Sequence, residues 1–404
     1  MKLSVDDVRN AYERIRSGVV VTPCVPAPAF AQFVPCPLYL KLESLQRTGS
    51  FKDRGALNRL LDLNDEQRAR GVVTASAGNH AQAVAYHGSR LGIPVSVVMP
   101  EATPLIKITN TRRYGARITQ HGATLSDSMS EARRLETEAG LTMVHPFDDE
   151  RVIAGQGTIA LELIEQVPDI THIIAPIGGG GLLGGIGATL KQLRPDVTVI
   201  GVEAAAAPSA LRSREKGEIV HIETQETIAD GIAVKRVGER TFPLLEEYVD
   251  RIVAIDEDAI AVAVHLLIER QKLVAEGAGA VPLAALLCRA IELAPGDVAV
   301  LVISGGNIDV NIIQRIIERG LVREGRLAQL VVRMRDRPGS LARLTAMIAE
   351  AGANVLETVH RRAFADISVG EVEIVMQLET RGRDHAASII ELLESNGITV
   401  EEEA

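Results

Sequence analysis

The sequence has few of the features that mark secreted, membrane or nucleic-acid-binding proteins. Only three of its 404 residues are cysteines, and they are scattered without a CxxC or Cys/His cluster, so a disulfide framework is not expected. Tryptophan is absent, and no uninterrupted apolar run approaches the length that spans a bilayer. The N-terminus lacks the apolar segment of a signal peptide. We therefore expect a cytoplasmic protein with reduced thiols and no membrane partner.

The chain also has no excess of basic over acidic residues. The formal net charge is -10, which argues against a nucleic-acid partner, because nucleic acid needs a basic surface. Hydrophobic residues make up 46% of the chain and charged residues 24%, as in an ordinary soluble protein with room for two or three domains. Cys288 lies in an apolar helical run, so we expect it in the core.

Hydrophobic patterning divides the chain into two parts. Up to residue 320, continuous Val/Ile strands alternate with amphipathic helices, which indicates an α/β protein with parallel sheets. Residues 328–404 read strand, helix, strand, strand, helix, strand, a βαββαβ order typical of a ferredoxin-like domain. We place the linker between the two parts at residues 321–327.

The segment from Ser50 to Ala56 puts a lysine in the first turn of a predicted helix. Apolar residues recur at helical spacing after it, so the helix begins near Phe51, and Ser50 with Asp53 fits a capping box. The positive end of the helix dipole then disfavours an ammonium at Lys52, which favours the neutral amine that Schiff-base chemistry requires. Taken alone, this segment also fits a surface lysine near a helix cap.

A second segment follows a buried strand and opens a helix. Small residues there let the backbone approach a ligand, and the N–H groups of the helix start suit a carboxylate. A plain strand-to-helix turn with an N-cap residue is the alternative. The segment consists of Ser76, Ala77, Gly78, Asn79 and His80.

A run of four glycines follows the strand at residues 172–177. Unobstructed N–H groups at a helix N-terminus suit a phosphate. The same stretch also matches GxGxxG, and Glu203 ends the next strand, so a dinucleotide-binding oxidoreductase is a distant alternative. The predicted phosphate loop comprises Gly178, Gly179, Gly180, Gly181 and Leu182.

Ser304 follows the buried strand at residues 298–303, and we expect its hydroxyl to face the crevice at the strand end. An N-cap serine with turn glycines is the alternative here. The four segments together suit a phosphate, an anionic substrate group, a heteroaromatic ring and an amine. Pyridoxal phosphate accounts for all of them, whereas a dinucleotide leaves Lys52 and Ser304 without a role.

These segments together resemble the threonine ammonia-lyases (threonine dehydratases), which are fold-type II pyridoxal-phosphate enzymes, over residues 1–320. The tail, with Asp336-Arg-Pro-Gly-Ser-Leu and Gly352-Ala-Asn-Val-Leu, resembles an ACT domain, a module that usually binds amino acids. The resemblance implies a tryptophan synthase β-like fold of two subdomains, the smaller inserted at about residues 45–150. It also implies deamination of L-threonine to 2-oxobutyrate and ammonia, weaker action on L-serine, and a homodimer or tetramer whose ACT domains bind an effector.

The resemblance further implies a role for each segment. Lys52 holds the cofactor and serves as the base at Cα, while residues 76–80 bind the substrate carboxylate. The remaining cofactor contacts are Phe51 against the ring, Asn79 at the ring hydroxyl, Gly178–Leu182 at the phosphate, Ser304 at the ring nitrogen, and the acid Glu276 nearby.

Two positions separate this chain from its relatives. Racemase-like members carry a serine where Ala77 stands, so a serine racemase is disfavoured, whereas a hydroxyaspartate ammonia-lyase stays open. Metal-binding relatives place further acids after the strand that ends in Glu203. The run Ala204–Ser209 supplies none, which argues against a divalent ion, although Glu203 with backbone carbonyls could hold a monovalent cation.

Overall fold

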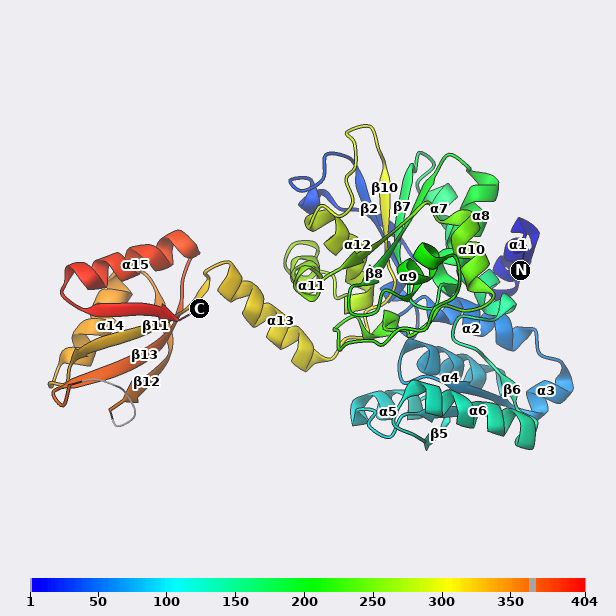
Figure 1. Ribbon diagram of the computed structural model, residues 1–404, viewed down its shortest axis with the longest axis horizontal. Helices are drawn as coiled ribbons and strands as arrows, with labels where there is room; N and C mark the ends of the chain where they lie inside the picture. The colour runs from blue at the N-terminus through cyan, green and yellow to red at the C-terminus, as the bar shows by residue number, and fades with distance from the viewer. Residues whose placement is uncertain (1, 363–367, 404) are drawn as a thin grey trace. The chain divides into compact units, whose positions relative to one another are not determined.

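The computed structural model describes residues 2–362 and 368–403 of a chain that folds as two compact units, Met1–Asp309 and Val310–Ala404 (Figure 1). The predicted α/β alternation occupies the first unit and the predicted βαββαβ order occupies the second, so the predicted fold class is confirmed. Each unit has a hydrophobic core of its own.

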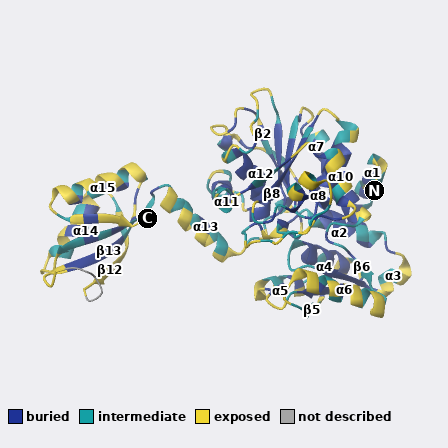
Figure 2. Ribbon diagram, in the orientation of Figure 1, coloured by how far each residue is buried: buried dark blue, intermediate teal, exposed yellow. Residues whose placement is uncertain are grey.

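A six-stranded sheet organises the larger part of the first unit, in the order β1-β2-β10-β7-β8-β9. All neighbours run parallel except β1, which is antiparallel to β2. Continuous runs of Val, Ile, Leu and Ala make the central strands buried on both faces (Figure 2). The strands are β1 (Cys24–Pro26), β2 (Leu38–Leu42), β7 (His172–Pro176), β8 (Thr198–Ala204), β9 (Arg251–Ile255) and β10 (Ala299–Ile303).

Helices cover both faces of this large sheet. They are α1 (Val5–Ile15), α7 (Glu150–Gln166), α8 (Gly181–Leu193), α9 (Ser209–Lys216), α10 (Thr241–Tyr248), α11 (Glu257–Gln271) and α12 (Gly277–Leu287). Helix α7 begins at Glu150, because the Asp149 carboxylate accepts hydrogen bonds from the N–H groups of Arg151 and Val152.

A second sheet of four parallel strands, in the order β5-β4-β3-β6, forms the smaller part of this unit. It spans residues 72–143, within the range predicted for the inserted subdomain, and has a separate core. Its strands are β3 (Val72–Ala75), β4 (Val95–Met99), β5 (Arg117–Gln120) and β6 (Thr142–Met143). The associated helices are α2 (Lys52–Leu61), α3 (Asp65–Arg70), α4 (Asn79–Leu91), α5 (Leu105–Arg112) and α6 (Leu125–Ala139).

The expectation for Cys288 was wrong. Helix α12 ends at Leu287, and Cys288 caps it as an exposed thiol, so the apolar run leaves the core one residue earlier than its composition indicates. All three cysteines are free thiols. In the described part of the chain, no helix combines the length and the apolar character needed to cross a membrane.

The second unit is an antiparallel sheet, in the order β12-β13-β11-β14, with two helices packed on it. Helix α13 precedes the sheet and continues through Arg323, so helix occupies the first residues of the predicted linker. The elements are α13 (Val310–Arg323), β11 (Leu327–Arg335), α14 (Ser340–Glu350), β12 (Asn354–Arg361), β13 (Glu371–Glu379), α15 (Arg383–Ser395) and β14 (Thr399–Glu403).

Candidate active site

The segments singled out in the sequence meet in one cavity of about 380 Å³ in the first unit. It lies where β3, β7 and β10 end and where α2, α4 and α8 begin, at the carboxyl ends of parallel strands. The lining includes Phe51, Lys52, residues 76–80, the glycine loop 178–182, Ser304 and Glu276. Glu203 is the one predicted site residue outside this lining.

The helix that carries Lys52 begins where the sequence predicted, but the hydrogen bonds at its N-terminus differ from those predicted. Ser50 makes no side-chain cap, so the predicted capping box is wrong. The Asp53 carboxylate turns back instead and accepts hydrogen bonds from the Thr48 N–H at 3.0 Å and the Thr48 hydroxyl at 2.5 Å. The Phe51 N–H donates to the Ser304 carbonyl at 3.0 Å. This bond ties the start of α2 to the end of β10.

Burial is the main influence on the pKa of the Lys52 amine. Burial lowers the pKa of Lys52 to about 8, and the nearby Glu276 carboxylate acts in the opposite direction. The Nζ atom donates to the Pro146 carbonyl at 2.7 Å and lies 5.0 Å from the centre of the Phe51 ring. About a tenth of the amine is therefore unprotonated at pH 7, far more than for a lysine of ordinary pKa.

Sequence reasoning missed the segment 145–148, which connects Lys52 to the glycine loop. The Nδ1 atom of His145 accepts the N–H groups of Phe147 and Asp148, and burial lowers the pKa of His145 to about 4, so this ring is neutral. That turn presents the Pro146 carbonyl to Lys52. The contact between this turn and Lys52 joins residues 94 positions apart, so no local pattern in the sequence indicates it.

The glycine loop leaves no room for side chains. A Cβ atom at Gly179 would lie 2.2 Å from the Phe147 ring, and Gly180 has a φ of +90°, which side-chain-bearing residues rarely adopt. The Thr241 hydroxyl donates to the Gly179 carbonyl at 2.6 Å and holds the loop from behind. The N–H groups at the start of α8, which have no intrahelical acceptor, open into the cavity lined by this loop.

Asn79 is held on two sides at the start of α4. Its Nδ2 atom donates to both Glu276 oxygens, at 2.8 and 3.0 Å, and its Oδ1 atom accepts from Asn307 at 2.7 Å. Burial raises the pKa of Glu276 to about 7, while the Asn79 bonds act to lower it. Glu276 is the N-cap residue of α12, so Asn79 links the small sheet to the large one.

His80 is neutral although it lies among polar groups. Burial, together with the Lys52 charge, lowers the pKa of His80 to about 3. Its Nε2 atom donates to the Val144 carbonyl at 2.9 Å. His80 therefore supplies neither a positive charge nor a base to the cavity.

Glu203 is buried away from the cavity. Both of its oxygens accept backbone N–H groups at the start of α9, from Ala210 and Leu211, each at 2.8 Å. Burial nevertheless raises the pKa of Glu203 to about 8. The acid therefore caps a helix in this structure, and the monovalent cation predicted there stays a prediction.

A buried ion network lies beneath the Lys52 helix and was also missed. The Arg54 guanidinium donates to Glu43 through two nitrogens at 2.8 Å, and to Glu162 at 2.6 and 2.8 Å. Lys41 donates to the same Glu162 at 2.5 Å, so two acids balance two bases. Arg54 lies two residues after Lys52, and its partner Glu162 is 108 positions away in the chain.

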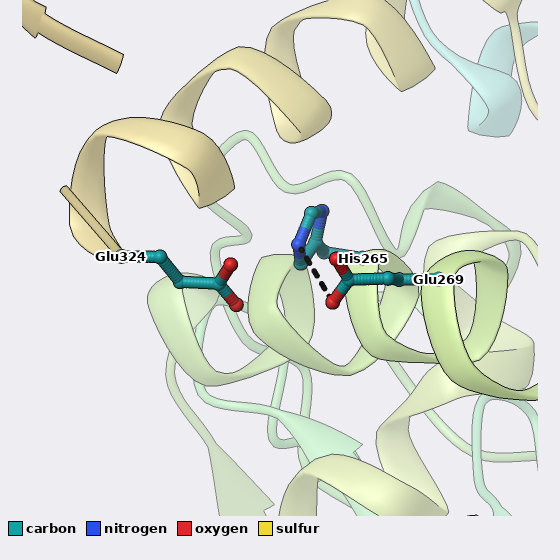
Figure 3. Close-up of side chains that lie close together, drawn as sticks. All are labelled: His265, Glu269 and Glu324. Atoms are coloured by element: carbon teal, nitrogen blue, oxygen red, sulfur yellow. Dashed lines mark ion pairs between the residues drawn. The ribbon is translucent and has the colours of Figure 1, made fainter. Parts of the chain in front are cut away.

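A further charged pair lies outside the cavity lining. His265 and Glu269, one turn apart on α11, form an ion pair at 3.7 Å (Figure 3). Neither belongs to the segments that carry the predicted chemistry.

The cavity fits pyridoxal phosphate on its own chemistry. It brings together one amine of lowered pKa, a helix N-terminus whose glycines exclude any Cβ, and a buried serine at the end of β10. An amine is the group that an aldehyde cofactor needs, and unobstructed N–H groups suit its phosphate.

Comparison with known proteins agrees with this chemistry. The family model described as pyridoxal-phosphate dependent enzyme matches residues 15–305, and the ACT domain model matches residues 328–397. The L-threonine ammonia-lyase of Geobacter sulfurreducens is 47% identical over 394 residues, which cover 98% of each chain.

Two solved structures resemble the first unit. A threonine deaminase from T.th. is 43% identical with a TM-score of 0.71, over 76% of this chain and 99% of that one. Serine racemase from Dictyostelium discoideum is 39% identical with a TM-score of 0.71, over 76% of this chain and 99% of that one. The chain therefore belongs to the family of pyridoxal-phosphate dependent enzymes and carries a C-terminal ACT domain.

Proposed function

We propose that this protein is an ammonia-lyase that converts L-threonine to 2-oxobutyrate and ammonia, and acts more weakly on L-serine. The single observation that carries the proposal is the Lys52 amine, with its pKa lowered to about 8, in one cavity with the glycine loop and Ser304. The relatives named for this activity match the chain over nearly its whole length. We also propose a cytoplasmic protein that forms dimers or tetramers.

Bound pyridoxal phosphate supplies an aldehyde that combines with amines and a ring that accepts electron density from Cα. The residues of this chain do the rest. The N–H groups of Gly178–Leu182 would hold the phosphate, Phe51 would pack against the ring and Asn79 would bind its hydroxyl. Ser304 would be the neutral partner of the ring nitrogen, and the start of α4 at residues 76–80 would hold the substrate carboxylate.

Lys52 governs proton movement at Cα. Because its pKa lies near 8, the Nζ atom can take the Cα proton at neutral pH, and the proton can then pass to the departing β-hydroxyl, which leaves as water. The position that could offer a second base is Ala77, which has no hydroxyl. With one base on one side of Cα, loss of the β-hydroxyl as water is favoured over racemisation.

Lys52→Ala tests the proposal. We expect this variant to release no 2-oxo acid from L-threonine and to lose the visible absorbance that borohydride abolishes in the parent protein. Lys235→Ala is the matched control, because Lys235 pairs with Glu223 outside the cavity lining. A Lys52→Ala variant with full activity would refute the proposal.

We further propose that the catalytic domain spans residues 1–320, with the linker at 321–327, and that the ACT domain at 328–404 binds an amino-acid effector. The separate core of the second unit supports a C-terminal domain, whereas the compact unit itself begins earlier, at Val310. A chain ending at residue 327 should keep deaminase activity and lose its response to branched-chain amino acids. An unchanged response would contradict the regulatory role.

A further inference from the structure

One ion pair crosses the cavity from one sheet to the other. Lys107, on α5 beside the small sheet, donates from Nζ to Asp230 Oδ2 at 2.5 Å. Asp230 begins a short 3-10 turn at residues 230–232, after β8 of the large sheet, and is 123 positions away in sequence. Both residues line the same cavity as Lys52. The pair therefore lines the cavity to which we assign the cofactor and the substrate.

Few charged side chains line the cavity, and this pair contains one of its two lysines. Among the described lining residues, the basic side chains are Lys52 and Lys107, since His80 is neutral. Lys52 is committed to the cofactor and to Cα, so Lys107 is the one cation that could receive a second substrate carboxylate. Asp230 already occupies it, and Glu276 and Asp309 add two further carboxyl groups to the same lining.

The exposure of the pair allows substrate to reach it. The Lys107 side chain is 33% exposed and that of Asp230 is 60% exposed, so the contact is open to solvent and small molecules. A substrate carboxylate near this pair would meet a lysine whose charge is already balanced by Asp230, and it would lie close to the Asp230 carboxylate. Repulsion between like charges in a partly enclosed cavity then disfavours its binding.

We propose that Asp230 is a specificity-determining residue, which holds Lys107 so that the site selects amino acids with an uncharged β-substituent and rejects those with a second carboxylate, such as 3-hydroxyaspartate. The inference rests on the proposed function and adds to it the chemical class of the side chain. It discriminates between the two ammonia-lyase activities that the sequence left open. The Asp230 carboxylate repels a substrate with a second carboxylate and leaves the binding of an uncharged side chain unaffected.

Asp230→Asn is the decisive variant, because asparagine keeps the shape and removes the charge that neutralises Lys107. We measure kcat/KM for L-threonine and for L-threo-3-hydroxyaspartate in parent and variant. We expect the ratio to move toward hydroxyaspartate by roughly twofold to fivefold, because the pair is exposed to solvent and its charges are screened. Adding Lys107→Met should cancel the shift. Glu223→Gln, which breaks the exposed pair with Lys235, is the matched control and should leave the ratio unchanged.

A second measurement does not depend on turnover. Inhibition constants of succinate and butyrate compare a dicarboxylate with a monocarboxylate, and Asp230→Asn should lower the succinate constant selectively. Equal changes for both substrates and both inhibitors would overturn the inference, because Asp230 would then only join the two sheets. A parent enzyme that prefers hydroxyaspartate would overturn it as well. A parent that deaminates neither substrate would refute the proposed function instead.

Discussion

Substitution of Arg54 by methionine is the sharpest test of the ion network beneath Lys52. Arg54, Glu43 and Glu162 are fully buried, and Arg54 makes paired hydrogen bonds to both acids. Burial by itself raises the pKa of Glu43, but Arg54 outweighs it and holds that pKa below the ordinary value. Methionine keeps the apolar stem and removes the charge, which leaves Lys41 as the one basic group for two buried acids.

The expected loss of unfolding free energy can be estimated from Glu43, the acid that loses its partner. The cheapest response of a buried, unpaired Glu43 is to take up a proton, which at pH 7 costs about 4 kcal/mol for a carboxyl of ordinary pKa near 4.3. This value agrees with the roughly 3–5 kcal/mol lost when one member of a buried pair is removed. At pH 5 the same protonation costs only about 1 kcal/mol. The destabilisation by Arg54→Met should therefore shrink as pH falls.

The assay is urea unfolding followed by circular dichroism, since the chain has no tryptophan to report by fluorescence. Hydrogen exchange of peptides from α2 should show that the loss of protection is local to this helix and its partners. Arg54→Met/Glu43→Gln should recover most of the stability at pH 7, because no unpaired charge is left. Arg70→Met, which breaks an exposed pair with Glu66 on α3, is the matched control and should have a much smaller effect.

Two outcomes would refute this reasoning. If Arg54→Met costs no more stability than Arg70→Met, the network does not hold α2. If the loss is the same at pH 7 and pH 5, the unpaired carboxyl is not its cause.

Two further predictions concern the cavity itself. In cofactor-free protein, the rate at which an acylating reagent modifies Lys52, measured by mass spectrometry, should rise with pH with a midpoint of about 8. Glu276→Gln should lower this midpoint, because Glu276 acts to raise the pKa of Lys52. A midpoint above 10 would show an ordinary, exposed lysine. Gly179→Ala should abolish retention of the cofactor on dialysis, because the added Cβ would lie 2.2 Å from the Phe147 ring, and Phe147→Ala in the same chain should restore part of it; unimpaired retention by Gly179→Ala would contradict the tight fit of the loop.

Much of the fold could be predicted because local patterns decide it. Continuous Val and Ile runs specify buried strands, and apolar residues at helical spacing specify the helices between them. Strand β6 could not be predicted because its two residues are too few for a period to show, and α9 and β9 were not predicted either.

The site was predictable where a segment carries its own chemistry. Four consecutive glycines, a lysine at a helix start and a serine after a buried strand each stand out along the chain, and the structure places all three in one cavity. The capping box predicted at Ser50 was wrong, because the Asp53 carboxylate accepts its hydrogen bonds from Thr48 instead. Cys288 failed because composition does not specify the residue at which a helix leaves the core.

The sequence by itself therefore determined the α/β and βαββαβ order of the two parts, and the segments that carry the amine, the phosphate loop and the serine. Only the tertiary structure decided how those groups behave. The lowered pKa of Lys52 depends mainly on burial, and the Arg54–Glu162 and Lys107–Asp230 contacts join residues more than 100 positions apart. The physical reason is that burial and long-range ion pairs are properties of packing between elements, whereas periodicity and helix-start chemistry are properties of neighbouring residues.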